Sequence, residues 1–200
     1  MPRPVRKGPA RGAGTLRIIG GDYRGRRLDI ADLEGLRPTG DRQRETLFNW
    51  LQMQTPGARV LDAFAGTGAL GLEAASRGAQ HVWLLEKQPK AVASLNQAVV
   101  TLGCAATVVR CDALKWLAQA ETEPFDLIFL DPPFAAGLWA DALAALIEHK
   151  RLADRAWVYL ESPKHQPITP PAGFELMKEK HSGDISMRLY QWSAPAMDAS

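Results

Sequence analysis

The sequence predicts an α/β domain built on a mostly parallel sheet with helices on both faces. Short apolar segments alternate with segments of helical periodicity, as expected for repeated strand–helix units. Glycines crowd the segment after the first central strand, and an acidic residue follows each of four successive strands. Because open α/β sheets bind ligands outside the carboxyl ends of their strands, these acids predict a ligand site at one edge of the sheet.

The N-terminal part of the chain carries most of the excess positive charge. Residues 1–44 contain eleven Lys or Arg against five Asp or Glu, whereas the remainder contains thirteen against seventeen. A basic arm on a mildly acidic domain is typical of proteins that bind polyanions. Residues 1–14 are rich in Pro, Gly and Arg, and we expect them to form a disordered basic tail that is still able to touch phosphates.

An extension of hairpin and helix is expected over residues 15–52, ahead of the core domain at 53–193. Alternating apolar residues and a Gly-Gly-Asp turn within Arg17–Leu28 predict a short hairpin. We expect this hairpin to carry three arginines to the substrate side of the protein: Arg24, Arg26 and Arg27.

A helix should begin near residue 41, where Thr39 or Asp41 is able to cap it. Its buried stripe is expected at i, i+3 and i+4 spacing, in Leu47, Trp50 and Leu51. Three charged residues then lie on or beside its exposed face: Arg42, Arg44 and Glu45. These side chains either bind a polyanion or form ordinary ion pairs within the helix.

The first central strand, Arg59–Asp62, leads into a glycine-rich turn and the start of a helix. Gly66, Gly68 and Gly71 match the spacing G-x-G-x-x-G, which serves both nicotinamide cofactors and S-adenosylmethionine. The glycines allow a tight turn and a close approach of the ligand to a helix N-terminus. Asp62 favours S-adenosylmethionine over a nicotinamide cofactor, because a carboxylate there would repel a pyrophosphate but attract the cationic end of S-adenosylmethionine.

The next two strands also end in acids. His81–Leu85 leads into Glu86, about twenty residues past the first glycine, where an acid is able to accept both ribose hydroxyls of a nucleotide. Thr107–Arg110 leads into Cys111 and Asp112, and Asp112 is placed to accept an adenine amino group. A lone acid after a strand is usually a solvated turn residue, but three of them after three successive strands indicate a binding site.

The fourth strand, Leu127–Leu130, is followed by Asp131-Pro132-Pro133-Phe134. Two prolines stop the strand and fix the backbone. A carboxylate, a turn carbonyl and an aromatic ring are thus presented together, which suits the exocyclic amine of a nucleobase. The carboxylate and the carbonyl accept its two N–H groups, and the ring stacks on the base. The alternative is a proline-terminated strand with an incidental acid, and the acids after the other strands favour the amine site.

The remaining elements complete the alternation. A fifth strand is expected at Trp157–Glu161, and an antiparallel pair near Phe174–Lys178 and Ser186–Trp192. Residues 194–200 are expected to fray. Helices are predicted at Leu70–Arg77, at Pro89–Leu102 with Gly103 as its C-cap, at Ala113–Ala120 and at Trp139–His149.

These motifs resemble those of class I S-adenosylmethionine-dependent methyltransferases, which have a Rossmann-like fold, and the Asp-Pro-Pro-Phe form resembles enzymes that methylate exocyclic amino nitrogens. Similarity to the RsmD family lies in the upstream segments Arg17–Gly21, Arg24–Arg26, Gly35–Thr39 and Arg42–Leu51. The resemblance extends over Thr15–Trp192, nearly the whole chain. It implies a seven-stranded sheet in the order 3-2-1-4-5-7-6. It also implies methylation of the N2 amine of one guanine in bacterial 16S rRNA, with the small ribosomal subunit as the expected partner.

The resemblance further implies a role for each motif residue. Catalysis would involve Asp131, Pro132, Pro133 and Phe134. Cofactor binding would involve Asp62, Phe64, Gly66, Gly68, Glu86, Lys87, Asp112 and Ala113. RNA binding would involve Arg24, Arg26, Arg27, Arg37, Thr39 and Arg42. The expected cofactor is S-adenosylmethionine, with S-adenosylhomocysteine as the product, and no metal is expected.

Composition narrows the class of protein. No stretch approaches the eighteen apolar residues of a membrane span, and the N-terminus lacks the apolar run of a secretion signal. Cys104 and Cys111 are too few and too close for a disulfide framework, and no C-x-x-C or His cluster suggests zinc. We expect two reduced thiols in a cytoplasmic protein, direct methyl transfer rather than covalent catalysis, and a monomer.

Three other interpretations stay open at this point. A nicotinamide oxidoreductase would explain the glycines and Glu86, but it leaves Asp131–Phe134 and the basic arm unexplained. A non-catalytic RNA-binding protein would use the arm without the carboxylates. An adenine-N6 methyltransferase acting on DNA or RNA would use the same four-residue motif, because the residues alone do not determine which base fits the pocket.

Overall fold

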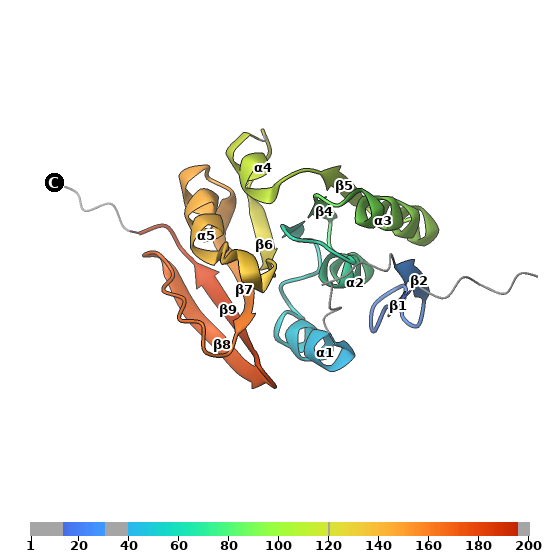
Figure 1. Ribbon diagram of the computed structural model, residues 1–200, viewed down its shortest axis with the longest axis horizontal. Coiled ribbons are helices and arrows are strands. Elements are labelled where there is room, and N and C mark those ends of the chain that lie inside the picture. The colour runs from blue at the N-terminus through green and yellow to red at the C-terminus, as the bar shows by residue number, and fades with distance from the viewer. Residues whose placement is uncertain (1–13, 31–39, 120, 196–200) are drawn as a thin grey trace, which may run out of the picture.

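The computed structural model describes residues 14–30, 40–119 and 121–195. Its centre is a seven-stranded sheet in the order β5-β4-β3-β6-β7-β9-β8, which is the predicted order (Figure 1). The first five strands in this order pair in parallel, whereas β9 is antiparallel to both of its neighbours. The strands are β3 (Arg59–Asp62), β4 (His81–Glu86), β5 (Ala106–Arg110), β6 (Phe125–Leu130), β7 (Leu152–Pro163), β8 (Phe174–Ser182) and β9 (Ile185–Trp192).

Helices cover both faces of the sheet. They are α1 (Asp41–Trp50), α2 (Ala69–Ser76), α3 (Pro89–Leu102), α4 (Ala113–Gln119) and α5 (Trp139–Glu148), with a short 3₁₀ helix η1 (Phe134–Ala136). Because side chains alternate along a strand, Val60, Leu127 and Phe129 pack toward α1, α2 and α3. Leu61 and Ile128 pack toward α4 and α5 on the other face. In the ranges that the structure describes, no helix has the length and apolarity to cross a membrane.

Element boundaries differ most from prediction in the C-terminal strands. β7 starts at Leu152 rather than Trp157, and β8 continues to Ser182 rather than Lys178. Pairing explains both extensions, since Leu152 pairs with a residue of β6 and Ser182 pairs with Ile185 at the turn into β9. β8 lies at the edge of the sheet and is exposed along nearly its whole length, so its sequence has no alternation that marks its end.

The N-terminal extension forms the predicted hairpin, in which β1 (Gly14–Arg17) pairs with β2 (Arg27–Ile30). The turn of this hairpin packs closely on the C-terminal end of α2. Gly21 has a left-handed φ of 74°, and a Cβ atom at this position would clash with the carbonyl group of Ser76. Only glycine fits here, which explains the second glycine of the Gly-Gly-Asp turn.

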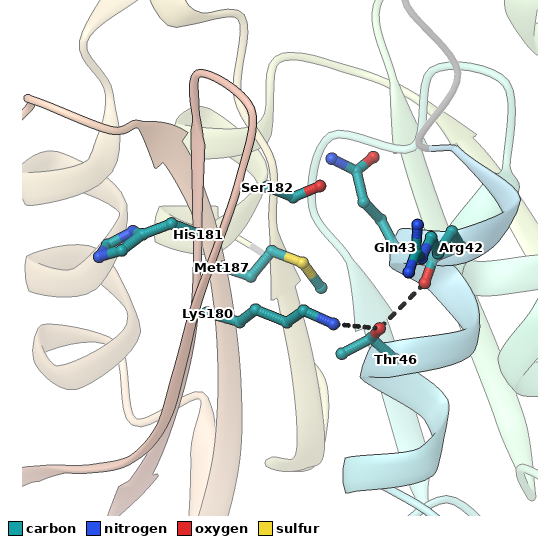
Figure 2. Close-up of a pocket in the computed structure, with 7 residues that line it drawn as sticks. All are labelled: Arg42, Gln43, Thr46, Lys180, His181, Ser182 and Met187. Carbon is teal, nitrogen blue, oxygen red and sulfur yellow. Dashed lines mark hydrogen bonds between the residues drawn. The ribbon is translucent and has the colours of Figure 1, made fainter.

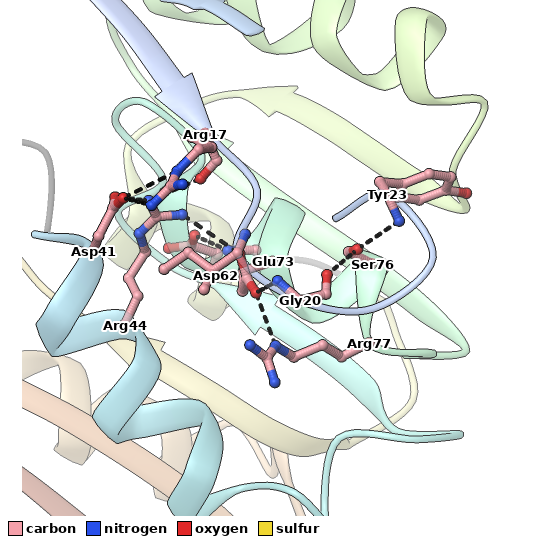
Figure 3. A network of polar contacts seen from close by, with 11 residues as sticks. Arg17, Gly20, Tyr23, Asp41, Arg44, Asp62, Glu73, Ser76 and Arg77 are labelled. Atoms are coloured by element: carbon pink, nitrogen blue, oxygen red, sulfur yellow. Dashed lines mark hydrogen bonds and ion pairs between the residues drawn. The ribbon is translucent and has the colours of Figure 1, made fainter. Parts of the chain in front are cut away.

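Glu73 on α2 joins the extension to the core (Figure 3). Its carboxylate is fully buried and accepts the backbone N–H groups of Ile19 and Gly20, each at 2.8 Å. It also pairs with Arg77 at 2.8 Å and with Arg44 of α1 at 3.5 Å. One buried carboxylate thus holds the hairpin, α1 and α2 together.

Ser76, near the C-terminal end of α2, fastens the rest of the hairpin turn. Its hydroxyl donates to the Gly20 carbonyl at 2.6 Å and accepts the Tyr23 N–H at 3.0 Å. Its backbone carbonyl accepts the Asp22 N–H at 2.7 Å. The hairpin turn is therefore bound to α2 through hydrogen bonds as well as through packing.

Arg44 departs from the prediction for α1, because it does not lie on or beside the exposed face. Its side chain is 1% exposed, and its guanidinium donates to the Arg17 carbonyl at 2.9 Å and pairs with Asp41 at 2.7 Å. Asp41 is the first residue of the helix and pairs with Arg44, so it does not cap the helix. Gly40 precedes the helix instead, and the side-chain oxygen of Gln43 accepts its N–H at 3.0 Å.

The buried stripe of α1 also differs in one member. Trp50, which was predicted to belong to it, is only half-buried. The stripe consists of Leu47, Phe48 and Leu51. The Phe48 ring meets Phe129 of β6 edge-on at 5.9 Å and the Arg77 guanidinium at 5.0 Å. Apolar packing and the Glu73 network therefore fix α1 from two directions.

Replacing Glu73 by alanine should lower the free energy of unfolding by about 3–5 kcal/mol, because two arginines and two backbone N–H groups lose a buried acceptor. Glu45 is exposed on α1 and provides the control. The Glu45→Ala change should alter the free energy of unfolding by less than about 0.5 kcal/mol. Urea unfolding followed by circular dichroism measures both, and equal stability of the two variants would show that the buried network contributes nothing.

Candidate active site at the carboxyl ends of the strands

The Asp-Pro-Pro-Phe tetrapeptide lies directly after β6. Asp131 is half-buried and Pro132 is buried, whereas Pro133 and Phe134 are exposed, the latter by 38%. The backbone turns back at once, because the Pro133 carbonyl accepts the Ala136 N–H at 2.9 Å within η1. Within the described residues, no hydrogen bond ends on the Pro132 carbonyl, so a ligand N–H has an acceptor there.

Asp62 ends β3 beside the glycine turn and is 2% exposed. One of its carboxylate oxygens accepts the Gly71 N–H at 2.9 Å, in the first turn of α2. Gly68, with a left-handed φ of 80°, precedes that helix. Burial, assisted by the nearby Glu86 carboxylate, raises the pKa of Asp62 to about 7. Asp62 therefore braces the turn, and a cation bound beside it would favour its ionised form.

Glu86 and Asp112 lie at the ends of the next two strands. The Glu86 carboxylate bridges two loops, because it accepts the Gly66 N–H at 3.0 Å and the Gln88 N–H at 2.7 Å. Asp112 is exposed, and its carboxylate accepts the Lys115 N–H at 3.1 Å in the first turn of α4. Both carboxylates stabilise the local backbone, and both keep lone pairs for a ligand.

Cys111 lies between these two acids. Burial, together with the carboxylates of Asp112 and Glu86, raises the pKa of the Cys111 thiol to about 11. The thiol is therefore protonated at neutral pH, which agrees with direct methyl transfer rather than a cysteine nucleophile. The other predicted cofactor residues of these loops differ in exposure: Phe64 is half-buried, Lys87 is exposed and Ala113 is buried.

Carboxyl groups from three neighbouring strands converge on the tetrapeptide. Asp62 pairs in register with Phe129, two residues before Asp131, so β3 and β6 bring the two acids to the same edge. The pKa of Asp131 lies well above its usual range, first because of burial and then because of the Glu161 and Asp62 carboxylates. The glycine turn and the tetrapeptide thus lie near each other at the carboxyl edge of the sheet.

Glu161 and Trp139 support the tetrapeptide and were not among the predicted site residues. The Glu161 carboxylate is buried, accepts the Tyr159 hydroxyl at 2.8 Å and has a pKa raised by burial. Its backbone carbonyl accepts the Trp139 indole N–H at 2.8 Å, and the Trp139 ring lies 6.0 Å from that of Phe134. An acid directly after an apolar strand, the pattern used for the other strands, was the signal that could have identified Glu161.

The described members of the predicted RNA-binding group do not lie together. Arg24 and Arg26 are exposed in the hairpin turn, near the C-terminal ends of α2 and α3, where Arg26 donates to the Thr101 carbonyl at 3.4 Å. The end of α2 lies where the strands begin, because the carbonyl of Gly78 accepts the N–H of Gly57 just before β3. Arg24 and Arg26 therefore lie at the edge of the sheet opposite to the tetrapeptide, and their contact with RNA stays a prediction.

The remaining residues of this group fall in different places. Arg27 is exposed in β2 and pairs in register with Arg17. Arg42 is exposed in the first turn of α1. Arg37 and Thr39 lie outside the described residues, and so do most of the predicted disordered tails at 1–14 and 194–200.

Comparisons with known proteins match nearly the whole chain. A family model described as "Conserved hypothetical protein 95" matches residues 16–191. Ribosomal RNA small subunit methyltransferase D of Haemophilus influenzae is 44% identical over 182 residues, which cover 89% of this chain and 94% of that protein. The protein of the same name from Escherichia coli K12 is 45% identical over 185 residues, with 92% and 93% covered.

A solved structure bears out the fold. The structure described as the putative methyltransferase yhhF from Escherichia coli has a TM-score of 0.85 and 42% identity, covering 91% of this chain and 100% of that one. The matched residues include the extension from residue 16 onward and all four acids that follow the central strands. The chain therefore belongs to the RsmD family, the family of the ribosomal RNA small subunit methyltransferases D.

Proposed function

We propose that the chain methylates the N2 amine of one guanine in 16S rRNA, using S-adenosylmethionine, within partly or fully assembled small ribosomal subunits. The observation that carries the proposal is the convergence of Asp62, Glu161 and Asp131 beside the exposed ring of Phe134. The names of the relatives support the RNA class of the substrate. The choice of the N2 amine rests on the family resemblance and on the tetrapeptide.

The residues around the glycine turn fit the proposed cofactor. Glu86 offers a carboxylate to the ribose hydroxyls, and Asp112 offers one to the adenine amino group. Among the described residues, no Lys or Arg forms an ion pair with these acids or with Asp62. A cationic ligand supplies the missing positive charge, whereas a pyrophosphate would meet the Asp62 carboxylate. When bound, S-adenosylmethionine supplies a methyl group on a sulfonium centre and leaves as S-adenosylhomocysteine.

The tetrapeptide would hold and activate the target amine. The two N–H groups of the target amine donate to the Asp131 carboxylate and the Pro132 carbonyl. These hydrogen bonds favour a pyramidal nitrogen as the N–C bond forms. Phe134 stacks on the extruded base, a contact worth about 1–3 kcal/mol. Burial, together with the Glu161 and Asp62 carboxylates, makes the Asp131 carboxylate more basic than an ordinary one. In its ionised form it is therefore suited to take the proton that the amine loses after methyl transfer.

Cofactor affinity should rise with pH. Asp62 has a pKa of about 7 in the free protein, and a nearby cation lowers that pKa, so the ionised form binds the cofactor more tightly. Between pH 6 and pH 8 the affinity for S-adenosylmethionine should increase by up to about tenfold. Asp62→Asn keeps an acceptor for the Gly71 N–H and should flatten this dependence. Calorimetry at the two pH values measures it, and an equally steep rise in the variant would contradict the role of Asp62.

Asp131→Asn should bind S-adenosylmethionine within about threefold of wild type and lose methyl transfer by a factor of about 10² or more, because the charge on this group matters most in the transition state. Asp141→Asn, at an exposed position early in α5, is the control and should retain activity. Single-turnover transfer of a labelled methyl group measures both variants. Transfer by Asp131→Asn at a near wild-type rate would show that this residue does not activate the amine.

The function itself is tested with three substrates from cells that lack the enzyme: free 16S rRNA, small subunits and adenine-rich duplex DNA. Labelled methyl should appear as N2-methylguanosine, chiefly from small subunits. Label in N6-methyladenine would replace the guanine assignment with an adenine-N6 activity. The absence of label from all three substrates would reject the proposed function.

A further inference from the structure

A cleft of about 250 Å³ lies between α1 and the hairpin formed by β8 and β9 (Figure 2). Lys180 and Ser182 of β8 point toward α1, whereas the ring of His181 points to the other side of the strand (Figure 2). The His181 ring is held there, with Nδ1 2.8 Å from the Ser186 hydroxyl. The cleft is lined by Arg42, Gln43, Thr46, Lys180, His181, Ser182 and Met187.

The lining of this cleft has the chemistry of an anion site. Arg42 and Lys180 bring two positive charges, and Gln43 and Ser182 bring neutral donors. Among the residues that the structure describes, no carboxylate lines the cleft. Of the described acids adjacent to a lining residue along the chain, Asp41 pairs with Arg17 and Arg44, and Glu179 pairs with Arg188. Glu45 is exposed on α1 and does not line the cleft. Within the described residues, neither Arg42 nor Lys180 forms an ion pair.

Lys180 is already directed into the cleft by a short chain of hydrogen bonds. Its Nζ donates to the Thr46 hydroxyl at 3.1 Å, and that hydroxyl donates to the Arg42 carbonyl at 3.0 Å. An ammonium group has three N–H donors, so at least one remains for an anion. The position of the charge is therefore set before any ligand binds.

The cleft lies at the same edge of the sheet as the tetrapeptide. Met187 of β9 is the register partner of both Lys180 on β8 and Glu161 on β7. Glu161 follows the residue that pairs with Leu130, and Leu130 directly precedes Asp131. Three interstrand spacings separate β6 from β8, or about 14 Å across the sheet. A nucleic-acid chain whose target base lies at Asp131 is long enough to span this distance and reach the cleft.

We propose that this cleft binds a backbone phosphate of the RNA a few nucleotides from the target guanine, with Arg42 and Lys180 as its charged ligands. The inference rests on the proposed function and deepens it. It assigns RNA contact to the C-terminal hairpin, at the catalytic edge, rather than to the turn of the N-terminal hairpin. Phosphate contacts of this kind position an RNA without reading its sequence.

The test compares Lys180→Gln with the matched control Lys178→Gln. Lys178 is exposed on the same strand, about 7 Å farther from the β8–β9 turn, and does not line the cleft. Small subunits from cells lacking the enzyme are the ligand, and their binding is measured at several salt concentrations together with KM, kcat and cofactor affinity. Lys180→Gln should weaken binding and raise KM by about three- to tenfold, with kcat and cofactor affinity unchanged.

The salt dependence gives a second readout. Lys180→Gln should reduce the slope of log affinity against log salt concentration by about one unit or less, as expected for one lost phosphate contact, and Lys178→Gln should leave it unchanged. If the wild-type chain methylates small subunits but Lys180→Gln binds them with unchanged affinity and salt dependence, only this inference is overturned. Equal losses in both variants would also overturn it, because they indicate diffuse charge rather than a site. Failure of the wild-type chain to act on any RNA would instead overturn the proposed function.

Discussion

The buried carboxylate of Glu73 is the constraint on which the arrangement of the N-terminal half depends. It lies in α2, a helix whose other residues are apolar or small and almost all buried. An ionised carboxylate in such surroundings costs several kcal/mol in desolvation unless both oxygens are well paired. Here the partners are two backbone N–H groups at the start of the hairpin turn and two guanidinium groups, one of them from α1. Satisfying one buried charge therefore fixes the positions of two other elements.

This constraint divides the basic residues of the extension between structure and recognition. Arg44 is buried in the Glu73 network and is not available to an RNA. Arg42 lies on the exposed side of the same helix and lines the cleft together with Lys180 of β8. In the described part of residues 1–44, the basic side chains thus do not form one recognition surface. By holding α1 against the core, Glu73 also sets one wall of the cleft at the catalytic edge, although it touches neither the proposed cofactor site nor the proposed phosphate site.

The strands, their order and the edge at which the acids gather could be predicted, because they follow from local patterns and from a family resemblance that spans the chain. The positions that prediction missed are decided by tertiary partners. Arg44 precedes Leu47, Phe48 and Leu51 by three, four and seven residues, so helical periodicity already placed it on the buried face. A charged side chain is expected at the surface, and the burial of Arg44 is explained only by its pairing with the Glu73 carboxylate. The same spacing argument does not predict which way the hairpin turn points, because nothing local in Arg24 or Arg26 specifies the end of α2 against which they lie.

The claim that Glu73 makes the extension and the catalytic sheet one body is tested most directly by amide hydrogen exchange in the wild-type chain. Ile19 and Gly20 lie in a loop, and their N–H groups donate to the Glu73 carboxylate. If that carboxylate holds the two parts together, both amides should exchange about as slowly as that of Leu61 in the central strand β3, through opening of the whole domain. Exchange of Ile19 and Gly20 at the rate of exposed loop amides, with the Leu61 amide still protected, would contradict the claim.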